Sequence, residues 1–240
     1  MPRFFKEYFD EETKITGEDG RHISRSLRMR IGETLTVCDT KGTDYLCEIT
    51  DIVDTDVSLK ILEKTESAGE PTLKVTLFQC IPKGDKLDTV VQKTVELGVT
   101  QIVPVLSEHC VSRPDEKSMK KKCARLNKIA LEAAKQCGRG IIPEVVDMIS
   151  FKNCCKELEK FDASILFYEL GGKPIREIMN KDIKNIAILI GPEGGFAKSE
   201  VELALEHGAT AATLGKRILR TETAPLAALT SVMLLSGNLE

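Results

Sequence analysis

The chain has 240 residues, enough for one large domain or two small ones, and its 42% of hydrophobic and 30% of charged residues are typical of a soluble globular protein. No stretch approaches the roughly 18 uncharged apolar residues of a membrane helix, and the N-terminus turns acidic too early for a signal peptide. The net charge of −3 argues at first against a nucleic-acid partner.

The first region, residues 1–70, is predicted to be a small, mostly β module of the kind that forms a barrel. Three segments rich in β-branched and aromatic residues are expected strands: 33–39, 44–50 and 56–64. Thr40–Thr43 has the composition of a hairpin turn, and His22–Met29 is expected to form a short helix. The polar segment Ser67–Pro71 is the predicted linker.

The second region, residues 71–240, alternates apolar runs with helical patterns. The runs 73–80, 101–106, 163–168 and 186–190 are expected strands, since short unbroken apolar runs are typical of strands covered on both faces. Expected helices follow at 87–97, Lys117–Cys137, Pro174–Asn180, Lys198–His207 and Thr223–Ser236. This alternation predicts an α/β fold with a parallel sheet and helices on both faces.

The cysteines indicate a reducing environment. The chain has eight, scattered and without any C-x-x-C pair, so we expect reduced, mostly buried thiols in a cytoplasmic protein and no zinc site. The histidines His22, His109 and His207 have no metal-ligand spacing and are interpreted as structural or exposed.

Two loops near the C-terminus have the composition of a ligand site. Gly191–Phe196, GPEGGF, connects an expected strand to an expected helix, and ligands of parallel sheets bind at the carboxyl ends of strands. Its spacing fits neither G-x-G-x-x-G nor a P-loop, so a tight connection without a ligand stays open. Leu214–Ala224 carries Arg217, Arg220 and Glu222 between two apolar elements; helix capping by threonine with surface ion pairs is the alternative.

Together these loops resemble the SPOUT-class methyltransferases, specifically the 16S rRNA (uracil-N3) methyltransferase branch. The resemblance extends to PRFF at Pro2–Phe5, to His22–Gly32, and to the stretches 83–99 and 128–145. Ile23 stands where the family often has a second histidine, which leaves His22 without an assigned role.

The resemblance implies a particular architecture and reaction. It implies that residues 71–240 form a SPOUT domain with a deep trefoil knot and that residues 1–70 form a PUA-like RNA-binding barrel. It also implies S-adenosylmethionine as cofactor, a homodimer, and N3-methyluridine in 16S rRNA of the small ribosomal subunit as product. No metal and no membrane partner are expected.

The resemblance also assigns the site by position. The residues expected to bind the cofactor are Phe167, Tyr168, Glu169, Ile190, Gly191, Glu193, Gly194, Leu214, Gly215, Ile218, Leu219, Thr223 and Ala224. Arg220 is expected to stabilise negative charge on the uracil oxygens and Glu222 to accept the N3 proton, with Glu193 and Glu169 as competing carboxylates.

Clusters of basic residues suggest where RNA binds, since local patches neutralise phosphates even on an acidic chain. Arg21–Arg30 contains four arginines and no acid, and a second cluster runs from Arg113 to Lys128. The RNA-binding candidates are Arg3, Arg25, Arg28, Arg30, Lys83, Lys86, Lys93, Arg113, Lys135 and Arg139. Solvated helix faces are the alternative interpretation.

Two other functions stay open. One is a non-catalytic RNA-binding or ribosome-assembly factor with the same fold. The other is a methyltransferase that acts on ribose 2′-oxygens or on tRNA, although the sequence LGKRILRTETA favours the uracil-N3 branch.

Overall fold

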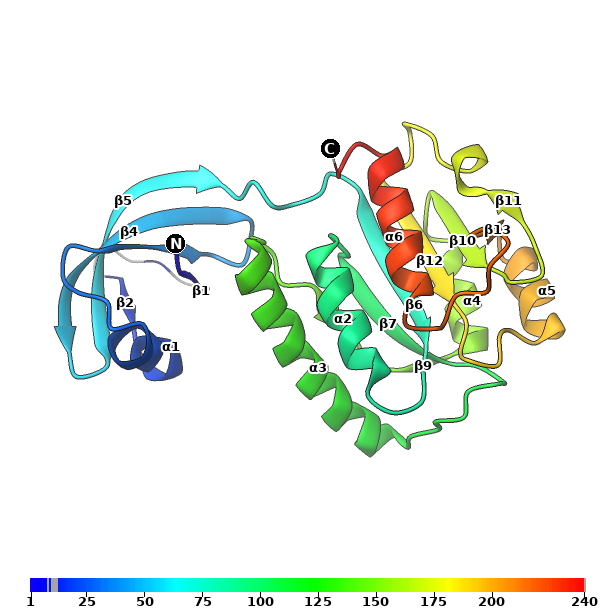
Figure 1. Ribbon diagram of the computed structural model, residues 1–240, viewed down its shortest axis with the longest axis horizontal. Helices are drawn as coiled ribbons and strands as arrows, with labels where there is room; N and C mark the ends of the chain where they lie inside the picture. The colour runs from blue at the N-terminus through cyan, green and yellow to red at the C-terminus, as the bar shows by residue number, and fades with distance from the viewer. Residues whose placement is uncertain (8, 10–12, 240) are drawn as a thin grey trace. The chain divides into compact units, whose positions relative to one another are not determined.

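The computed structural model describes residues 1–7, 9 and 13–239, and Figure 1 traces them. Contacts divide the chain into two compact units. The first is Met1–Glu70 together with Ala134–Ile142, and the second is Pro71–Ala133 together with Pro143–Glu240. The sequence suggested a boundary near residue 70 but gave no sign that a later segment rejoins the first unit.

The first unit contains a five-stranded sheet in the order β1-β3-β4-β5-β2. The strands are β1 (Arg3–Phe5), β2 (Lys14–Ile15), β3 (Thr34–Cys38), β4 (Thr43–Val53) and β5 (Asp56–Glu66). The three predicted strands are confirmed as β3, β4 and β5, which form two successive antiparallel pairs. Thr40 and Gly42 have φ of 63° and 93°, so the turn between β3 and β4 uses the left-handed backbone region.

The helical part of the first unit begins earlier than predicted. Helix α1 (Gly17–Arg21) leads into a π-helical turn, η1 (His22–Ser26), and the helix expected over His22–Met29 is therefore wrong in its limits. Gly20 allows this path, because a Cβ there would lie 2.1 Å from the backbone oxygen of Thr55. Ile23 is fully buried in the core of the unit with Leu35 and Ile49.

The second unit is built on an eight-stranded parallel sheet in the order β11-β13-β10-β12-β6-β7-β8, with β9 also paired to β7. Its strands are β6 (Lys74–Cys80), β7 (Gln101–Leu106), β8 (Glu144–Val145), β9 (Ile149–Ser150), β10 (Ala163–Phe167), β11 (Lys173–Pro174), β12 (Asn185–Ile190) and β13 (Ala209–Thr213). The predicted strands are confirmed in β6, β7, β10 and β12, whose side chains are almost all buried. The knot implied by the resemblance stays a prediction.

Helices cover both faces of this sheet, as predicted. They are α2 (Lys86–Glu96), α3 (Glu116–Cys137), α4 (Phe151–Leu158), α5 (Lys198–Glu206) and α6 (Ala224–Leu235). Helices α2 and α6 contact each other, and α6 contacts β6 and β12; α4 and α5 form a second contacting pair, against β7 and β13 (Figure 1). The helix predicted over Pro174–Asn180 is wrong: Pro174 is extended in β11, and only a 3-10 turn, η2 (Ile175–Glu177), follows.

All eight cysteines are free thiols, and seven of them are buried, as expected. Within the described residues, no cluster of three or more metal-ligating side chains occurs, and no helix is long and apolar enough to cross a membrane.

Candidate active site

A cavity of about 530 Å³ lies at the carboxyl ends of three neighbouring strands. Strands β10, β12 and β13 end at Phe167, Ile190 and Thr213, and the loops that follow them form the walls. The lining residues are Lys86, Phe167, Tyr168, Glu169, Ile190, Gly191, Pro192, Glu193, Gly194, Gly195, Thr213, Leu214, Gly215, Lys216, Arg217, Ile218, Leu219, Arg220, Thr221 and Ala224. This is the edge at which ligands of parallel sheets bind.

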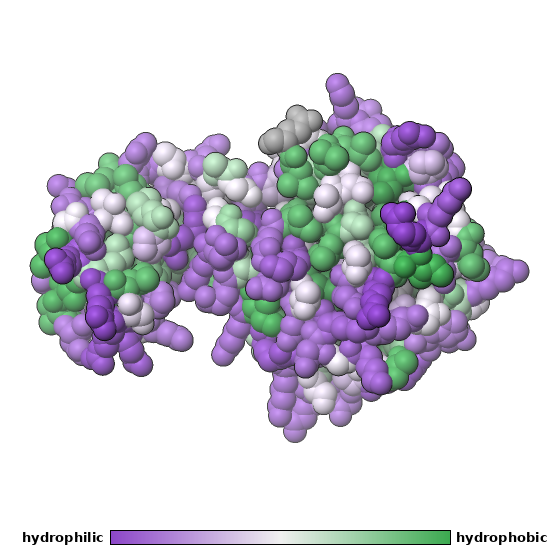
Figure 2. Space-filling model, in the orientation of Figure 1, coloured by the Kyte–Doolittle hydropathy of each residue, from purple (hydrophilic) through white to green (hydrophobic). Residues whose placement is uncertain are grey.

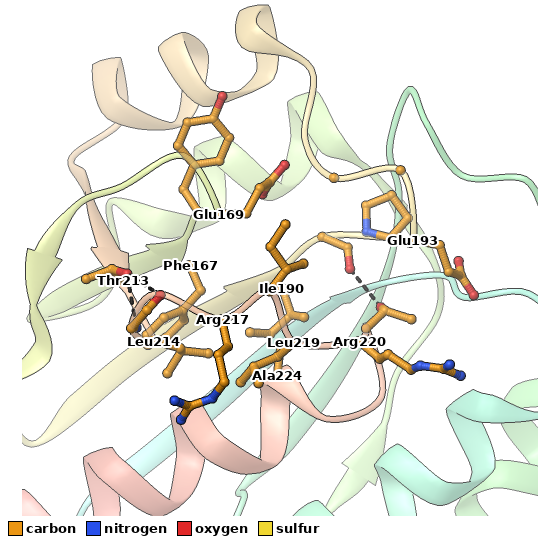
Figure 3. Close-up of a pocket in the computed structure, with 18 of the residues that line it drawn as sticks. Phe167, Glu169, Ile190, Glu193, Thr213, Leu214, Arg217, Leu219, Arg220 and Ala224 are labelled. Atoms are coloured by element: carbon orange, nitrogen blue, oxygen red, sulfur yellow. Dashed lines mark hydrogen bonds between the residues drawn. The ribbon is translucent and has the colours of Figure 1, made fainter.

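The lining is apolar at the centre and charged at the rim. Figure 3 shows Ile190, Leu219 and Ala224 close together, with Glu169 above this group and Glu193 to its right. The labelled Arg220 side chain extends from its loop away from that centre (Figure 3). Such a site suits a ligand with an apolar body and charged ends.

A buried glutamate holds the end of the glycine-rich loop after β12. Glu200, buried in α5, accepts from the backbone N–H of Ala197 at 3.1 Å and from that of Glu108 at 2.8 Å. Gly195 has φ of +69°, and a Cβ there would lie 2.2 Å from the carboxylate of Glu169. Glycine at this position therefore permits both the backbone turn and the close approach of Glu169.

The second loop is fixed by Thr221, which is buried. Its hydroxyl donates to the carbonyl oxygen of Gly191 at 2.8 Å and accepts from Nε2 of Gln79 at 3.2 Å. The carbonyl of Arg220 accepts from the backbone N–H groups of Thr223 and Ala224 at 2.8 and 2.9 Å. Thr223 is the N-cap of α6 but makes no side-chain capping bond, so the capping alternative does not explain this loop.

Lys86, at the start of α2, lies between two carboxylates. Its ammonium nitrogen is 2.9 Å from Glu193 and 3.3 Å from Glu222. Partial burial raises the pKa of Glu193, but hydrogen bonds from Lys86 and from the backbone N–H groups of Glu193 and Lys83 outweigh it, so the net shift is downward. The hydrogen bond to Glu193 is the largest cause of the raised pKa of Lys86.

The two carboxylates differ in how fully their oxygens are occupied. Oε1 of Glu193 accepts from both Lys86 and the backbone of Lys83. Oε2 of Glu222 is buried and accepts no hydrogen bond from the described residues, because Lys86 meets it only as an ion-pair contact without hydrogen-bond geometry. The carboxylate of Glu222 is therefore less fully hydrogen-bonded than that of Glu193.

Most residues predicted to bind the cofactor line the cavity, and one does not. Thr223 lies outside the lining, as does Glu222, which reaches the site through its contact with Lys86. Lys86 itself was predicted only as an RNA contact, and the structure places it in the cavity wall. Sequence reasoning did not name the lining residues Pro192, Gly195, Thr213, Lys216, Arg217 and Thr221 individually, nor Gln79 behind them; Arg217 was at least visible as a charge in the loop.

Several predicted RNA contacts of the first unit are engaged within that unit. Arg3 pairs with Asp44, and its Nη1 donates to the carbonyl of Arg139 at 3.1 Å. The side chain of Arg139 is 3% exposed and pairs with Glu70 at 2.8 Å. Such burial does not suit a phosphate contact, so the structure gives Arg139 a structural role instead.

The remaining RNA-binding candidates divide into side chains that have a polar partner and exposed side chains that make no ion pair. The paired ones are Arg25 with Asp54, Lys135 with Asp19, Lys93 with Glu96, and Arg113 with the carbonyls of Ser107 and Glu108. Among the described residues, the exposed side chains of Arg28, Arg30 and Lys83 make no ion pair. Arg28 also has φ of 53°, a backbone conformation uncommon outside glycine.

Two family profiles match the chain. One, described as an RNA methyltransferase domain, matches residues 69–233, and the other, described as an RNA methyltransferase PUA domain, matches residues 15–62. The first covers the sheet, the cavity and both loops, and the second covers most of the five-stranded sheet.

Individual relatives cover nearly the whole chain. Ribosomal RNA small subunit methyltransferase E of Bacillus subtilis is 36% identical over 97% of this chain and 96% of its own length. The protein of the same name from Buchnera aphidicola is 31% identical over 100% and 98%. The crystal structure of ribosomal RNA small subunit methyltransferase E from Neisseria gonorrhoeae, bound to S-adenosyl methionine, matches with a TM-score of 0.88 and 34% identity over 98% of both chains. The chain therefore belongs to the ribosomal RNA small subunit methyltransferase E family of RNA methyltransferases.

Proposed function

We propose that this protein transfers the methyl group of S-adenosylmethionine to N3 of a uridine in 16S ribosomal RNA. The names of the relatives support the small-subunit rRNA substrate, and the cofactor bound to the Neisseria protein supports the methyl donor. The resemblance of both loops to the uracil-N3 branch supports the acceptor atom. The observation that carries the proposal is the loop Leu214–Ala224, which joins the apolar wall of the cavity to Arg220 and Glu222.

The residues of the cavity suit S-adenosylmethionine. The volume of the cavity, about 530 Å³, is in the range of small-molecule sites, roughly 300–1,000 Å³. The apolar side chains of Ile190, Leu214 and Leu219 suit the faces of an adenine ring, and the carboxylates of Glu169 and Glu193 suit a ligand that carries positive charge. When bound, the cofactor would supply a methyl group that its sulfonium already makes electrophilic.

The protein must therefore align uracil N3 and remove its proton. Oε2 of Glu222 is buried and meets only the ammonium of Lys86, at 3.3 Å, among the described residues, whereas Oε1 of Glu193 accepts from two donors and the pKa of Glu193 is lowered. Glu222 is thus the better acceptor for the proton that leaves N3 as the new N–CH3 bond forms and the S–CH3 bond breaks. Arg220 supplies positive charge for the uracil oxygens, in an exposed side chain that extends away from the apolar centre of the cavity (Figure 3).

A complementation experiment tests this function. In a strain lacking the gene, the wild-type protein should restore N3-methyluridine in 16S rRNA, measured by mass spectrometry. In single-turnover assays, Glu222→Gln should slow methyl transfer by about a hundredfold or more and Arg220→Ala by about a hundredfold. Glu206→Gln, an exposed carboxylate at the end of α5, is the control and should leave the rate unchanged.

Two results would contradict parts of the proposal. Full single-turnover methylation by Glu222→Gln, with loss in Arg220→Ala, would remove Glu222 as the base. If S-adenosylmethionine leaves the melting temperature unmoved and no methyl is transferred, the protein is a non-catalytic RNA-binding factor.

Arg28, Arg30 and Lys83 are the proposed phosphate contacts, because their side chains are exposed and make no ion pair within the described chain. Replacing any one by glutamine should make the slope of log affinity against log salt shallower by about one in filter binding. Lys160, which pairs with Glu157 at 2.6 Å, is the control. An unchanged slope removes the residue concerned from the RNA surface.

We expect the protein to work as a homodimer in the cytoplasm, with both subunits contributing to RNA binding, as the resemblance implies. Helix α6 contains no charged residue, and Leu234 and Leu235 on it are 54% and 48% exposed. Figure 2 shows a hydrophobic area over this helix. Such an area suits a second copy of the chain. Leu234→Glu should shift the sedimentation coefficient from dimer to monomer, and a wild-type monomer would contradict the expectation.

A further inference from the structure

Gln79 is a polar side chain inside the most buried part of the second unit. It lies near the end of β6, between β12 and β7 in the sheet, and its exposure is 0%. The residues beside it on the strand, Phe78 and Cys80, are also buried. A buried glutamine is uncommon unless its amide has a specific task.

The amide of Gln79 begins a hydrogen-bonded chain that ends at the cavity. Nε2 donates to the carbonyl of Cys80 at 3.0 Å and to Oγ1 of Thr221 at 3.2 Å. Oγ1 of Thr221 donates in turn to the carbonyl of Gly191 at 2.8 Å. The chemistry of these groups fixes the direction: the Cys80 carbonyl can only accept, and the single hydroxyl hydrogen of Thr221 is used on Gly191, so the NH2 group must face both.

The other half of the amide is not satisfied in this way. Oε1 of Gln79 is buried and accepts no hydrogen bond from the described residues. Burial of an unpaired carbonyl oxygen is unfavourable, so this half of the amide adds nothing to stability. The two N–H donors are what the residue contributes, and one of them acts on a residue that lines the cavity.

Thr221 stands directly between Arg220 and Glu222 in the chain. Its hydroxyl connects the loop after β13 to the loop after β12, while the carbonyl of Arg220 is held by the N–H groups of Thr223 and Ala224. Rotation or displacement of Thr221 would therefore move the backbone from which both charged side chains project.

We propose that Gln79 is a positioning residue for methyl transfer: through Thr221 it fixes the backbone of Arg220–Glu222 against Gly191, although Gln79 itself does not line the cavity. The inference rests on the proposed roles of Arg220 and Glu222. Small displacements of catalytic groups cost up to about a hundredfold in rate, so the effect belongs to the transfer step and not to cofactor affinity.

The experiment compares four variants of the full-length protein with the wild type. Gln79→Met keeps the length of the side chain but removes the donors, Thr221→Val removes the hydroxyl, Thr221→Ser retains it, and the double variant combines the first two. Thr94→Val is the matched control, since Thr94 is also fully buried and donates to a backbone carbonyl, that of Val90 at 2.7 Å, inside α2.

Three measurements are made on each protein: the single-turnover rate at saturating S-adenosylmethionine and RNA, the dissociation constant for S-adenosylmethionine, and the melting temperature. Gln79→Met and Thr221→Val should each lower the rate by about tenfold to a hundredfold, while the dissociation constant changes by less than about threefold. Thr221→Ser should keep the rate. Gln79→Met should not melt below Thr94→Val, because it also removes the unpaired Oε1.

The double variant decides whether the two residues act as one unit. Its rate should equal that of the slower single variant, because the second substitution removes nothing further. Multiplied losses in the double variant, or a wild-type rate in Gln79→Met, would overturn the proposal. A loss of rate in Thr94→Val as large as that in Gln79→Met would also overturn the proposal.

Hydrogen exchange separates this proposal from the proposed function. The amides of Thr223 and Ala224, which bond to the carbonyl of Arg220, should exchange faster in Gln79→Met and Thr221→Val than in the wild type or Thr94→Val. If the wild type transfers no methyl to RNA, the proposed function fails, and the exchange data still decide the positioning. Unchanged exchange in an active enzyme refutes the positioning alone.

Discussion

Glu70 holds the segment that rejoins the first unit. Its carboxylate accepts from Nε and Nη2 of Arg139 at 3.2 and 2.8 Å, and from the backbone N–H groups of Gly140 and Ile141 at 2.8 and 2.9 Å. The side chains of Arg139 and Glu70 are 3% and 18% exposed, so water screens the pair only weakly. We therefore predict that Glu70→Ala releases this segment.

The size of the effect follows from the burial. Removing one partner of a buried ion pair costs about 3 to 5 kcal/mol, whereas Glu70→Gln keeps an acceptor oxygen and should cost about 1 to 2 kcal/mol. Since each 1.4 kcal/mol is a factor of ten, amides of Ala134–Ile142 should exchange at least about a hundredfold faster in Glu70→Ala. Hydrogen exchange followed by mass spectrometry measures this directly.

Glu63→Gln is the control, because Glu63 is exposed on β5 and carries the same charge. It should leave exchange in the segment unchanged. If Glu70→Ala accelerates exchange by less than about threefold, or no more than Glu63→Gln, the reasoning from burial is refuted.

Three further predictions concern the second unit. Gly172→Ala should cost about 1 to 3 kcal/mol more than Gly208→Ala in thermal unfolding, because a Cβ at Gly172 would lie 2.6 Å from the backbone of Ala211 whereas Gly208 faces open space. Interaction with Cys80, aided by Ser107, lowers the pKa of Cys110 from 9.0 to about 6. Between about pH 6 and 9 the folded state then binds fewer protons than the unfolded state, so the free energy of unfolding should rise with pH in this range. This contribution of the thiolate should be lost below pH 6. Denaturant titrations of Cys110→Ala should show a weaker rise. Lys86→Met should raise the pKa of Glu193, measured by carboxyl NMR titration, and Lys93→Met should not.

Much of the second unit could be predicted because its strands are buried on both faces. The runs containing Val103, Ile165 and Ile188 are almost entirely apolar, which is the pattern of a covered parallel strand. Two-residue strands such as β8 and β11 carry no periodic signal, so they were invisible. Segments rich in β-branched and aromatic residues predicted strands β3, β4 and β5, and Thr40–Thr43 predicted the turn between the first two. The early start of α1 accompanies the close approach of Gly20 to the backbone of Thr55, which no local pattern encodes.

The loops that form the site could be predicted from the sequence, but the ion pairs and hydrogen bonds between their side chains could not. Composition and the family resemblance identified Gly191–Phe196 and Leu214–Ala224, and the cavity lies at both. Charge alone could not separate Lys86, which contacts Glu193 and Glu222, from exposed lysines such as Lys83. Likewise Gln79 is 142 residues from Thr221 in the chain. The two meet because β6 and β12 are neighbours in the sheet and α6, which follows Thr221, packs against both strands.

The return of the chain to the first unit at Ala134–Ile142 sets the order in which the protein is completed during synthesis. Arg139 follows Glu70 by 69 residues, which takes the ribosome about 3 to 14 seconds at roughly 5–20 residues per second. The strands of the first unit are therefore synthesised well before Arg139, Gly140 and Ile141, which donate hydrogen bonds to Glu70. A fragment that ends at Glu70 lacks the donors of Arg139, Gly140 and Ile141 that complete the first unit. Exchanging residues 1–70 between relatives likewise separates this carboxylate from the donors with which it occurs.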